Sequence, residues 1–597
     1  MIGEPWQAEE AVMTKRVAIV GGGISGIYTA WRLLQQNQED VSLHRQLSFQ
    51  IHLYERESRL GGRIRSEKIP GTDFRAELGA MRFRPSHLIL NTLLAELDVP
   101  ICDFELPPPT YYVRGRRLTS AEEVAGNCSC CQAGGPFHLR DNERGQSATE
   151  LVRFAIDGVL RALNFPRLSQ GQARQLKMRI RKRYFNKSTW ELIKEHGIYQ
   201  GLQLYNIGFW NLLQHFLSNE AYVMVHDMLS LESILGNWNA AEAIPWFLAD
   251  FASDQYSMVR GGLSSVADKL KDRIDPETNS SLQGRIELRK GFIVHSLSNE
   301  HGMWTLTHSK DQQENHDEYD IVILALPKRP LRELRVTTAD PQFEWPPKWV
   351  NWVKGHRMFK LFLLYESAWW MGDSLPGHDT GRVFTDLPLR QIYYFSPSWM
   401  AQHGHHDVGC EEESAAQGDQ VDKGGKALIM ASYSDEHYVS FWEPMLNPNP
   451  EWGLMVDSGQ PYLQRSAKIT DRDWEKIPTE HADVLARKRM VDKVQLLLTE
   501  IHGREVPQPI LGMVRDWDAG WHTWIVHSKP WTEEIKKARV QPLPPNLFLC
   551  GEAYSNEQGW IEGALKSAEQ VLLELRVLKP AWTKGRNIQN FHKYVSE

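Results

Sequence analysis

Cysteine, surplus charge and long apolar runs are all scarce in this sequence of 597 residues. Six cysteines are too few for a disulfide framework in so long a chain, which fits a reducing compartment. A net charge of −7 gives no reason to expect nucleic acid as a partner. No run of about 18 apolar residues offers a membrane span, and the acidic start lacks the apolar core of a signal peptide. We therefore expect a cytoplasmic protein of two or three domains.

A glycine-rich turn follows the first β-branched run of the sequence. Residues 16–20 have the composition of a buried parallel strand, and Gly21, Gly23, Ser25 and Gly26 come directly after it. Gly21 allows a tight turn, Gly23 lets backbone approach a pyrophosphate, and Gly26 lets the next helix pack closely on the strand. A helix over residues 24–36 would point its positive N-terminus at the phosphates. The pattern predicts a dinucleotide-binding turn.

An acidic residue that suits a ribose ends the next predicted strand. Residues 50–54 form that strand, and Glu55 follows it with Arg56 beside it. The carboxylate would accept hydrogen bonds from an adenosine ribose. Glu55 lies further from the glycines than the usual interval of about 20 residues. We therefore predict a loop insertion over residues 37–49.

The rest of the sequence changes character several times. Residues from about 121 to 250 have a mostly helical pattern, with capping boxes at Ser120 with Glu123 and at Ser188 with Glu191. Residues 255–335 return to an α/β pattern, and a strand-rich middle follows. A buried strand over 546–550 and a helix over 560–575 come last. The architecture is predicted to be discontinuous.

Several short motifs carry a family resemblance. They are Glu55, Leu60-Gly61-Gly62-Arg63, Glu77-Leu78-Gly79-Ala80-Met81-Arg82, Gly551-Glu552 and Gly559-Trp560. In this order they resemble the flavin amine oxidase superfamily, and within it the L-amino acid oxidases. The resemblance implies an α/β fold in which a Rossmann-type FAD-binding domain (residues 14–90, 255–335 and 540–580) joins a mixed-sheet substrate-binding domain (91–120 and 336–539) and a helical domain (121–254).

The resemblance also implies an activity. It is the FAD-dependent oxidative deamination of L-α-amino acids, with hydride transfer to flavin and dioxygen as the acceptor. The products are a 2-oxo acid, ammonia and hydrogen peroxide. In amino acid oxidases the arginine at the position of Arg82 binds the substrate carboxylate, and a guanidinium suits that task because it offers two parallel N–H donors and stays charged. The alternative is that Arg82 makes only a structural salt bridge.

Further substrate contacts follow from the same resemblance. Tyr433 matches a tyrosine that binds the carboxylate, Trp521 and Gly559 match residues that face the substrate, and Trp560 matches the residue beside the flavin ring. The alternative for each aromatic side chain is an ordinary place in the core. Competing candidates are Tyr393, Tyr394 and Trp524, and alternation along a strand would send only one of the two tyrosines toward a given side.

Lys360 interrupts the apolar strand predicted over residues 359–365. Desolvating an ammonium is costly, so this position needs a reason. By resemblance, Lys360 holds a water at flavin N5. Alternatively it lies on the solvent side of an edge strand. By the same resemblance Glu552 hydrogen-bonds the ribityl chain, and the amides of Trp560 and Ile561 stabilise negative charge near flavin N1 and O2.

The predicted cofactor contacts form one larger set. It comprises Gly21, Gly23, Ser25, Gly26, Glu55, Arg56, Gly62, Arg63, Gly79, Ala80, Met81, Arg82, Val294, Gly551, Glu552, Gly559, Trp560 and Ile561.

Other clusters are interpreted as incidental, and no metal site is expected. Neither Cys128, Cys130 and Cys131 nor the polar stretch with His403, His405, His406 and Cys410 has the spacing of a zinc site. A basic run on a probable helix, from Arg174 to Arg183, indicates a surface or interface rather than a nucleic-acid patch.

Three readings of the activity stay open beside the oxidase. They are an amide-forming amino acid monooxygenase, an amine or polyamine oxidase, and a flavoprotein without turnover. The preferred side chain is also open, since aromatic walls suit bulky apolar groups whereas Asp435 or Glu436 could address a basic one. We expect a homodimer or a higher homo-oligomer.

Overall fold

The computed structural model describes residues 13–42, 47–126, 134–250, 255–404, 425–446, 485–540, 546–577 and 591–596. Five parallel strands drawn from three distant parts of the sequence form one sheet, in the order β11-β2-β1-β15-β22. These strands are β11 (Ile286–Lys290), β2 (Leu47–Glu55), β1 (Met13–Val20), β15 (Ile321–Leu324) and β22 (Leu547–Leu549). The predicted Rossmann-type architecture and its discontinuity are confirmed, whereas the domain limits stay a prediction.

The parallel sheet is buried on both faces, which explains its apolar strands. Val17 and Ile19 face the helices α1 (Ile24–Ser42), α11 (Ser264–Ile274) and α18 (Ile561–Glu574). Ala18 and Val20 face a second sheet made of β12 (Ile293–Glu300), β13 (Met303–Lys310), β14 (Gln313–Tyr319) and β16 (Arg335–Thr338). The predicted loop insertion over 37–49 is wrong, because α1 continues to Ser42 and β2 begins at Leu47.

A seven-stranded mixed sheet forms the second part of the molecule, in the order β21-β17-β20-β19-β18-β6-β7. The strands are β21 (Leu511–Trp524), β17 (Val353–Tyr365), β20 (Ala427–Asp435), β19 (Gln391–Phe395), β18 (Gly381–Thr385), β6 (Thr110–Val113) and β7 (Arg116–Leu118). The helices α14 (His437–Leu446) and α16 (Lys488–His502) cover the face that carries Leu361 and Tyr394. The opposite face carries Phe362 and Tyr393.

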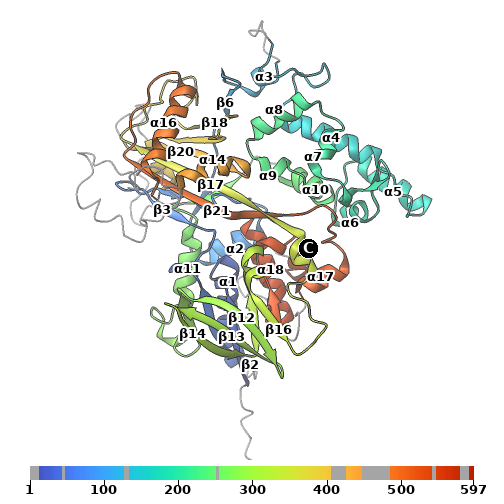
Figure 1. Cartoon of the computed structure of the whole chain (residues 1–597), viewed down its shortest axis with the longest axis vertical. Helices are drawn as coiled ribbons and strands as arrows, with labels where there is room; N and C mark the ends of the chain where they lie inside the picture. Colours follow the sequence, from blue (N-terminus) through green and yellow to red (C-terminus); the bar gives the residue numbers. More distant parts are fainter. Residues whose placement is uncertain are drawn as a thin grey trace, which may run out of the picture.

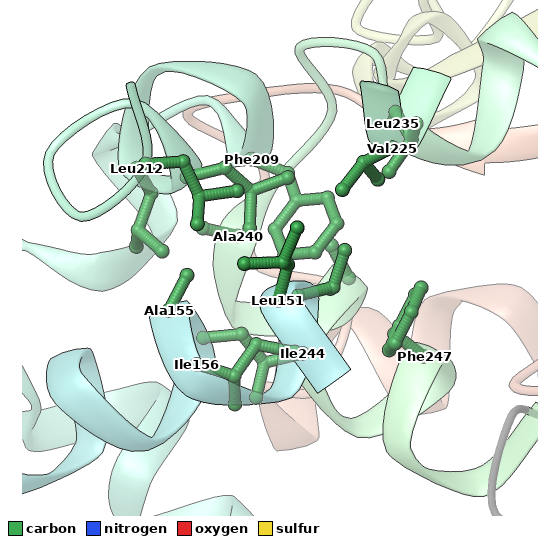
Figure 2. Close-up of a cluster of buried hydrophobic side chains, with 14 of the residues drawn as sticks. Leu151, Ala155, Ile156, Phe209, Leu212, Val225, Leu235, Ala240, Ile244 and Phe247 are labelled. Carbon is green, nitrogen blue, oxygen red and sulfur yellow. The ribbon is translucent and has the colours of Figure 1, made fainter. Parts of the chain in front are cut away.

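The third part is helical and lies apart from the parallel sheet (Figure 1). It comprises α4 (Ala148–Ala162), α5 (Gln170–Arg181), α6 (Lys187–His196), α7 (Phe209–Leu213), α8 (Asn219–Leu229), α9 (Glu232–Leu235) and α10 (Ala240–Asp250), with α3 (Ala121–Val124) before them. Figure 2 shows its core, in which Leu151, Phe209 and Phe247 converge from three of these helices. In the described part of the chain no helix is both long and apolar enough to cross a bilayer.

The two predicted helix caps have different outcomes. Ser120 accepts a hydrogen bond from the amide of Glu123, as a capping residue should. The cap predicted at Ser188 is wrong, because α6 begins at Lys187 and its cap is Asn186, which accepts a hydrogen bond from the amide of Thr189.

A buried ion pair joins the two ends of the described chain. On α1, Arg32 donates from Nε to Oε1 of Glu569 on α18 at 2.9 Å, and the Tyr28 hydroxyl donates to the same oxygen at 2.6 Å. The side chains of Arg32 and Glu569 are 3% and 2% exposed. Removing one partner of such a pair leaves a buried charge without compensation.

We therefore expect Glu569→Ala to lower the free energy of unfolding by about 3–5 kcal/mol. Replacing both partners, in Arg32→Met with Glu569→Leu, should cost less, because no buried charge remains. Urea unfolding monitored by tryptophan fluorescence measures both effects. The control is Glu333→Ala, which breaks an exposed pair with Arg329 and should cost no more than about 1 kcal/mol. Equal losses for Glu569→Ala and Glu333→Ala would contradict the assignment.

Candidate active site

A cavity of about 1040 Å³ opens at the carboxyl ends of the parallel strands. Val20, Glu55, Ala325 and Gly551 line it at the ends of β1, β2, β15 and β22, which is where open α/β sheets bind their ligands. Of the predicted cofactor contacts, the following line this cavity: Gly21, Gly23, Ser25, Glu55, Arg56, Gly62, Arg63, Ala80, Val294, Gly551, Glu552, Gly559, Trp560 and Ile561. The cavity therefore gathers residues from both ends of the chain.

The glycine turn has the shape that a pyrophosphate needs. Gly21 has a φ of 109°, a conformation that only glycine adopts easily. A Cβ at Gly23 would meet only the Cα of Gly62, at 4.0 Å, so backbone lies open to the cavity there. Gly26 instead packs against the carbonyl oxygen of Gly21, where a Cβ would clash. With α1 starting at Ile24, these residues fit a dinucleotide.

Glu55 is held in place at the end of β2. Its Oε2 accepts the amide of Gly22 at 2.7 Å, and its Oε1 accepts the amide of Glu57 at 2.8 Å. Burial raises the pKa of Glu55 although both amides lower it. The long interval before this residue lies partly in the extra turns of α1.

Glu552 is a buried anion that ties three segments together. It accepts hydrogen bonds from Arg63 Nη1 at 2.7 Å, from the amide of Gly559 at 2.7 Å, and from the amide and ring Nδ1 of His522 at 3.0 and 2.9 Å. Burial alone would raise the pKa of Glu552, but Arg63 and His522 hold it well below its usual range. Arg63 also donates to the Gly520 carbonyl at 3.0 Å. The carboxylate thus fixes the wall of the cavity.

Lys360 is buried on an inner strand of the seven-stranded sheet, next to the edge strand β21. Its side chain lies on β17, which pairs with β20 on one side and β21 on the other, and the residue is only 4% exposed. The alternative of a solvent-facing edge lysine is wrong. Nζ donates to the carbonyl oxygens of Glu77 at 2.9 Å and Gly79 at 2.7 Å. Burial lowers the pKa of Lys360. The ammonium fastens the turn that precedes Arg82.

Arg82 lies among aromatic rings beyond that turn. Its Cζ is 4.1 Å from the centroid of the Tyr256 ring and 5.9 Å from that of Phe104. Tyr393 and Tyr433 also interact with the guanidinium. Within the described ranges no salt bridge to Arg82 is formed, so the alternative of a structural ion pair finds no partner there. Gly79 and Met81 pack behind it, against backbone of Arg63 and in the apolar core.

Tyr393 and Tyr394 point to opposite faces of the seven-stranded sheet, as alternation along a strand predicts. Tyr393 faces the side of Met81 and Phe362, whereas Tyr394 points to the opposite face and bonds His502 through its hydroxyl at 2.8 Å. Tyr433 lies on the same side as Tyr393, and the Nζ of Lys360 is 4.8 Å from its ring centroid.

The tryptophans divide between wall and core. Trp560 lines the cavity, and its ring stacks on Tyr256 with centroids 6.3 Å apart. Trp521 abuts Gly559, where a Cβ would lie 2.9 Å from its Cε3. It also stacks on Trp246 and donates to Ser233 Oγ at 3.2 Å, so much of its surface is core. Trp524 is a core residue.

Sequence reasoning missed two residues of this site. Tyr256 bridges Arg82 and Trp560, and His522 completes the contacts of Glu552. Neither residue belongs to a recognisable motif. Tyr256 precedes a short strand, β10 (Ser257–Val259), and His522 follows a tryptophan in β21.

The acids considered for a basic substrate are already engaged. Asp435 is fully buried and accepts the amides of Glu232 and Ser233, each at 2.8 Å. Glu436 pairs with His356 and with Lys354.

Of the Cys and His clusters interpreted as incidental, only His403 belongs to the described residues. His403 stacks on Trp399 at the end of a helix. Cys128, Cys130, Cys131, His405, His406 and Cys410 lie outside the described residues. Among the described residues no group of His, Cys, Asp and Glu could hold a metal ion.

Gly23 and Gly26 give a matched test of whether the glycine turn binds the cofactor. Gly23→Ala should leave thermal stability unchanged but weaken FAD binding by about ten- to hundredfold, because the added methyl group occupies cavity space. Gly26→Ala should lower both the melting temperature and flavin content, since its methyl group meets backbone. Flavin absorbance per protein and thermal unfolding measure the two effects. A Gly23→Ala variant with full flavin content would show that the glycine turn does not bind the cofactor in this way.

Comparisons with known proteins agree with this geometry. Aplysianin-A of Aplysia kurodai is 22% identical over 94% of this chain and 90% of its own length. Achacin of Lissachatina fulica is 23% identical over 95% of this chain and 96% of its own length. An L-amino-acid oxidase of Siganus canaliculatus is 25% identical, over 65% of this chain and 63% of its own length.

The fold also matches a solved structure. A putrescine oxidase variant superposes with a TM-score of 0.57 at 14% identity, covering 94% of this chain and 99% of that chain. The sequence profile described as flavin containing amine oxidoreductase matches residues 24–410 and 476–571, which is most of the chain. The chain therefore belongs to the family of flavin containing amine oxidoreductases, with FAD as its cofactor.

Proposed function

We propose that this chain is an L-α-amino acid oxidase. The observation that carries the proposal is Arg82, a guanidinium two residues beyond Ala80 of the cavity lining, which makes no ion pair within the described ranges. A guanidinium matches a carboxylate with two parallel donors and keeps its charge in a water-poor place. Several relatives named L-amino-acid oxidase, including those of Siganus canaliculatus and Mus musculus, support this reading.

The aromatic side chains around Arg82 have a matching role. Tyr256 holds the guanidinium by a cation–π contact, while Tyr393 and Tyr433 flank it. Their rings leave the cation charged yet poorly hydrated, which strengthens its attraction for an anionic group. A carboxylate held there is oriented before any bond breaks, and such orientation supplies a large part of catalysis. No strong side-chain base is required.

FAD held by the residues of the cavity lining would supply the acceptor for the hydride of the substrate Cα, and dioxygen would serve as the final electron acceptor. Lys360 has one hydrogen-bond donor left over for a water molecule. An ammonium has three donors, and two are used by the carbonyls of Glu77 and Gly79. The remaining donor is available to hold a water, as the family resemblance assigns. Release of the imino acid and its hydrolysis then give a 2-oxo acid and ammonia.

A panel of L- and D-amino acids, assayed for peroxide and for 2-oxo acid, tests the proposal. We expect peroxide and 2-oxo acid in equal amounts from one or more L-amino acids, with no reaction of the D-enantiomers. An amide product would assign the chain to the monooxygenases. Faster oxidation of decarboxylated amines would assign it to the amine oxidases. A flavin-loaded protein that forms no peroxide with any substrate would refute turnover altogether.

Arg82→Ala should selectively impair substrates that carry a carboxylate. Losing one partner of a buried charge pair costs on the order of 2–5 kcal/mol. At roughly 1.4 kcal/mol per factor of ten, kcat/KM for the best amino acid should fall about thirtyfold to a few thousandfold. Oxidation of the corresponding decarboxylated amine should not fall. The control is Arg504→Ala, which removes a guanidinium 5.2 Å from the Trp369 ring, outside the cavity lining. Equal losses for acid and amine would overturn the role of Arg82.

A further inference from the structure

The helical part contains a long positively charged stretch, and none of its residues lines the cavity. Residues 158–190 contain nine lysines and arginines and no aspartate or glutamate, in a chain whose net charge is −7. The nine are Arg161, Arg167, Arg174, Lys177, Arg179, Arg181, Lys182, Arg183 and Lys187. A cluster of this kind creates a local positive field that the overall charge hides.

The structure places the centre of this cluster on one outward surface. In α5, Leu176 and Ile180 are buried against the helical core. Arg174, Met178, Arg181 and Lys182 are all exposed and follow one another at spacings of four, three and one, and we call them the α5 face. Figure 1 shows α5 at the outer edge of the helical part, far from the parallel sheet. The α5 face is thus accessible and separate from the cavity.

The charges of this cluster are poorly neutralised by the protein. Among the nine, and within the described part of the chain, Arg183 alone forms an ion pair, with Asp157. Lys177 donates to Asn164 Oδ1 at 3.3 Å, which leaves its charge uncompensated. Holding many like charges together on one surface is unfavourable unless an anionic partner neutralises them.

Two large side chains lie exposed among these cations. Met178 is 51% exposed at the centre of the α5 face, and Tyr184 is 57% exposed just after the helix. The phosphodiester backbone of a nucleic acid is charged and offers no apolar surface that an exposed methionine could contact. At a lipid surface it reaches the boundary of the acyl chains, while the cations meet the headgroups and tyrosine lies at the interface.

We propose that the α5 face binds anionic lipid bilayers. The partner is a surface of negatively charged headgroups, to which Arg174, Arg181 and Lys182 supply the attraction and Met178 a shallow apolar contact. The interaction does not depend on the proposed oxidase activity, because no residue of the α5 face lines the cavity.

Sedimentation with vesicles of phosphatidylcholine, with and without about one third phosphatidylglycerol, tests this on the flavin-loaded full chain. We expect binding to the anionic vesicles alone, weakening steeply as salt rises, because the attraction falls off within a Debye length. Reversing three charges, in Arg174→Glu with Arg181→Glu and Lys182→Glu, should weaken binding by at least roughly a hundredfold.

The matched control changes the same charge elsewhere. Lys269→Glu, Arg273→Glu and Arg489→Glu alter exposed cations outside the helical part and should bind like the parent. Met178→Ser should bind anionic vesicles severalfold more weakly while keeping the salt dependence. Flavin content and circular dichroism establish that each variant is folded.

Three outcomes would overturn the proposal. The first is an absence of binding to anionic vesicles at low salt, and the second is equal weakening by the control triple variant. The third is stronger retention on duplex DNA than on the vesicles with no effect of Met178→Ser, which would assign the surface to nucleic acid instead.

Discussion

A buried ammonium group fixes the turn that precedes Arg82, the residue proposed to bind the substrate carboxylate. Lys360 reaches from β17 of the seven-stranded sheet to the carbonyls of Glu77 and Gly79, which belong to the part of the chain that forms the dinucleotide cavity. Burying a cation is costly, and the two carbonyl dipoles offset that cost only in this geometry. Arg82 lies three residues beyond Gly79, so its position depends on this contact between β17 and the turn.

Glu552, a residue of the cavity lining, is a buried group of the opposite charge. It is an anion whose partners come from three separate segments, at Arg63, His522 and Gly559. Because each donor satisfies part of one carboxylate, the segments cannot shift independently of one another. Lys360 therefore holds the turn after Glu77 on the seven-stranded sheet, and Glu552 holds β21 of that sheet against the loops at Arg63 and Gly559.

The sequence predicts the parts of this site whose signals are local. The glycine turn, the acid after β2 and the strand before Gly551 each follow from a few adjacent residues. The length of α1 does not, because its last turns are polar and lack an apolar period. The side of the strand on which Trp521 lies does not follow either, because the pairing of β17 with β21 shifts between His356 and Met358. A bulge of this kind breaks the alternation on which such predictions rest.

The contacts of Tyr256 join residues that are far apart in the sequence, so no local pattern predicts them. Its ring lies between the guanidinium of Arg82 and the indole of Trp560, which come from residues separated by most of the chain. The ring thereby links the group proposed to hold the carboxylate with the wall at the N-terminus of α18. The proposed carboxylate site at Arg82 therefore shares an aromatic contact with Trp560 and the first turn of that helix, whose N-terminus favours negative charge. Because the Tyr256 ring contacts both Arg82 and Trp560, a change in this ring disturbs both side chains together.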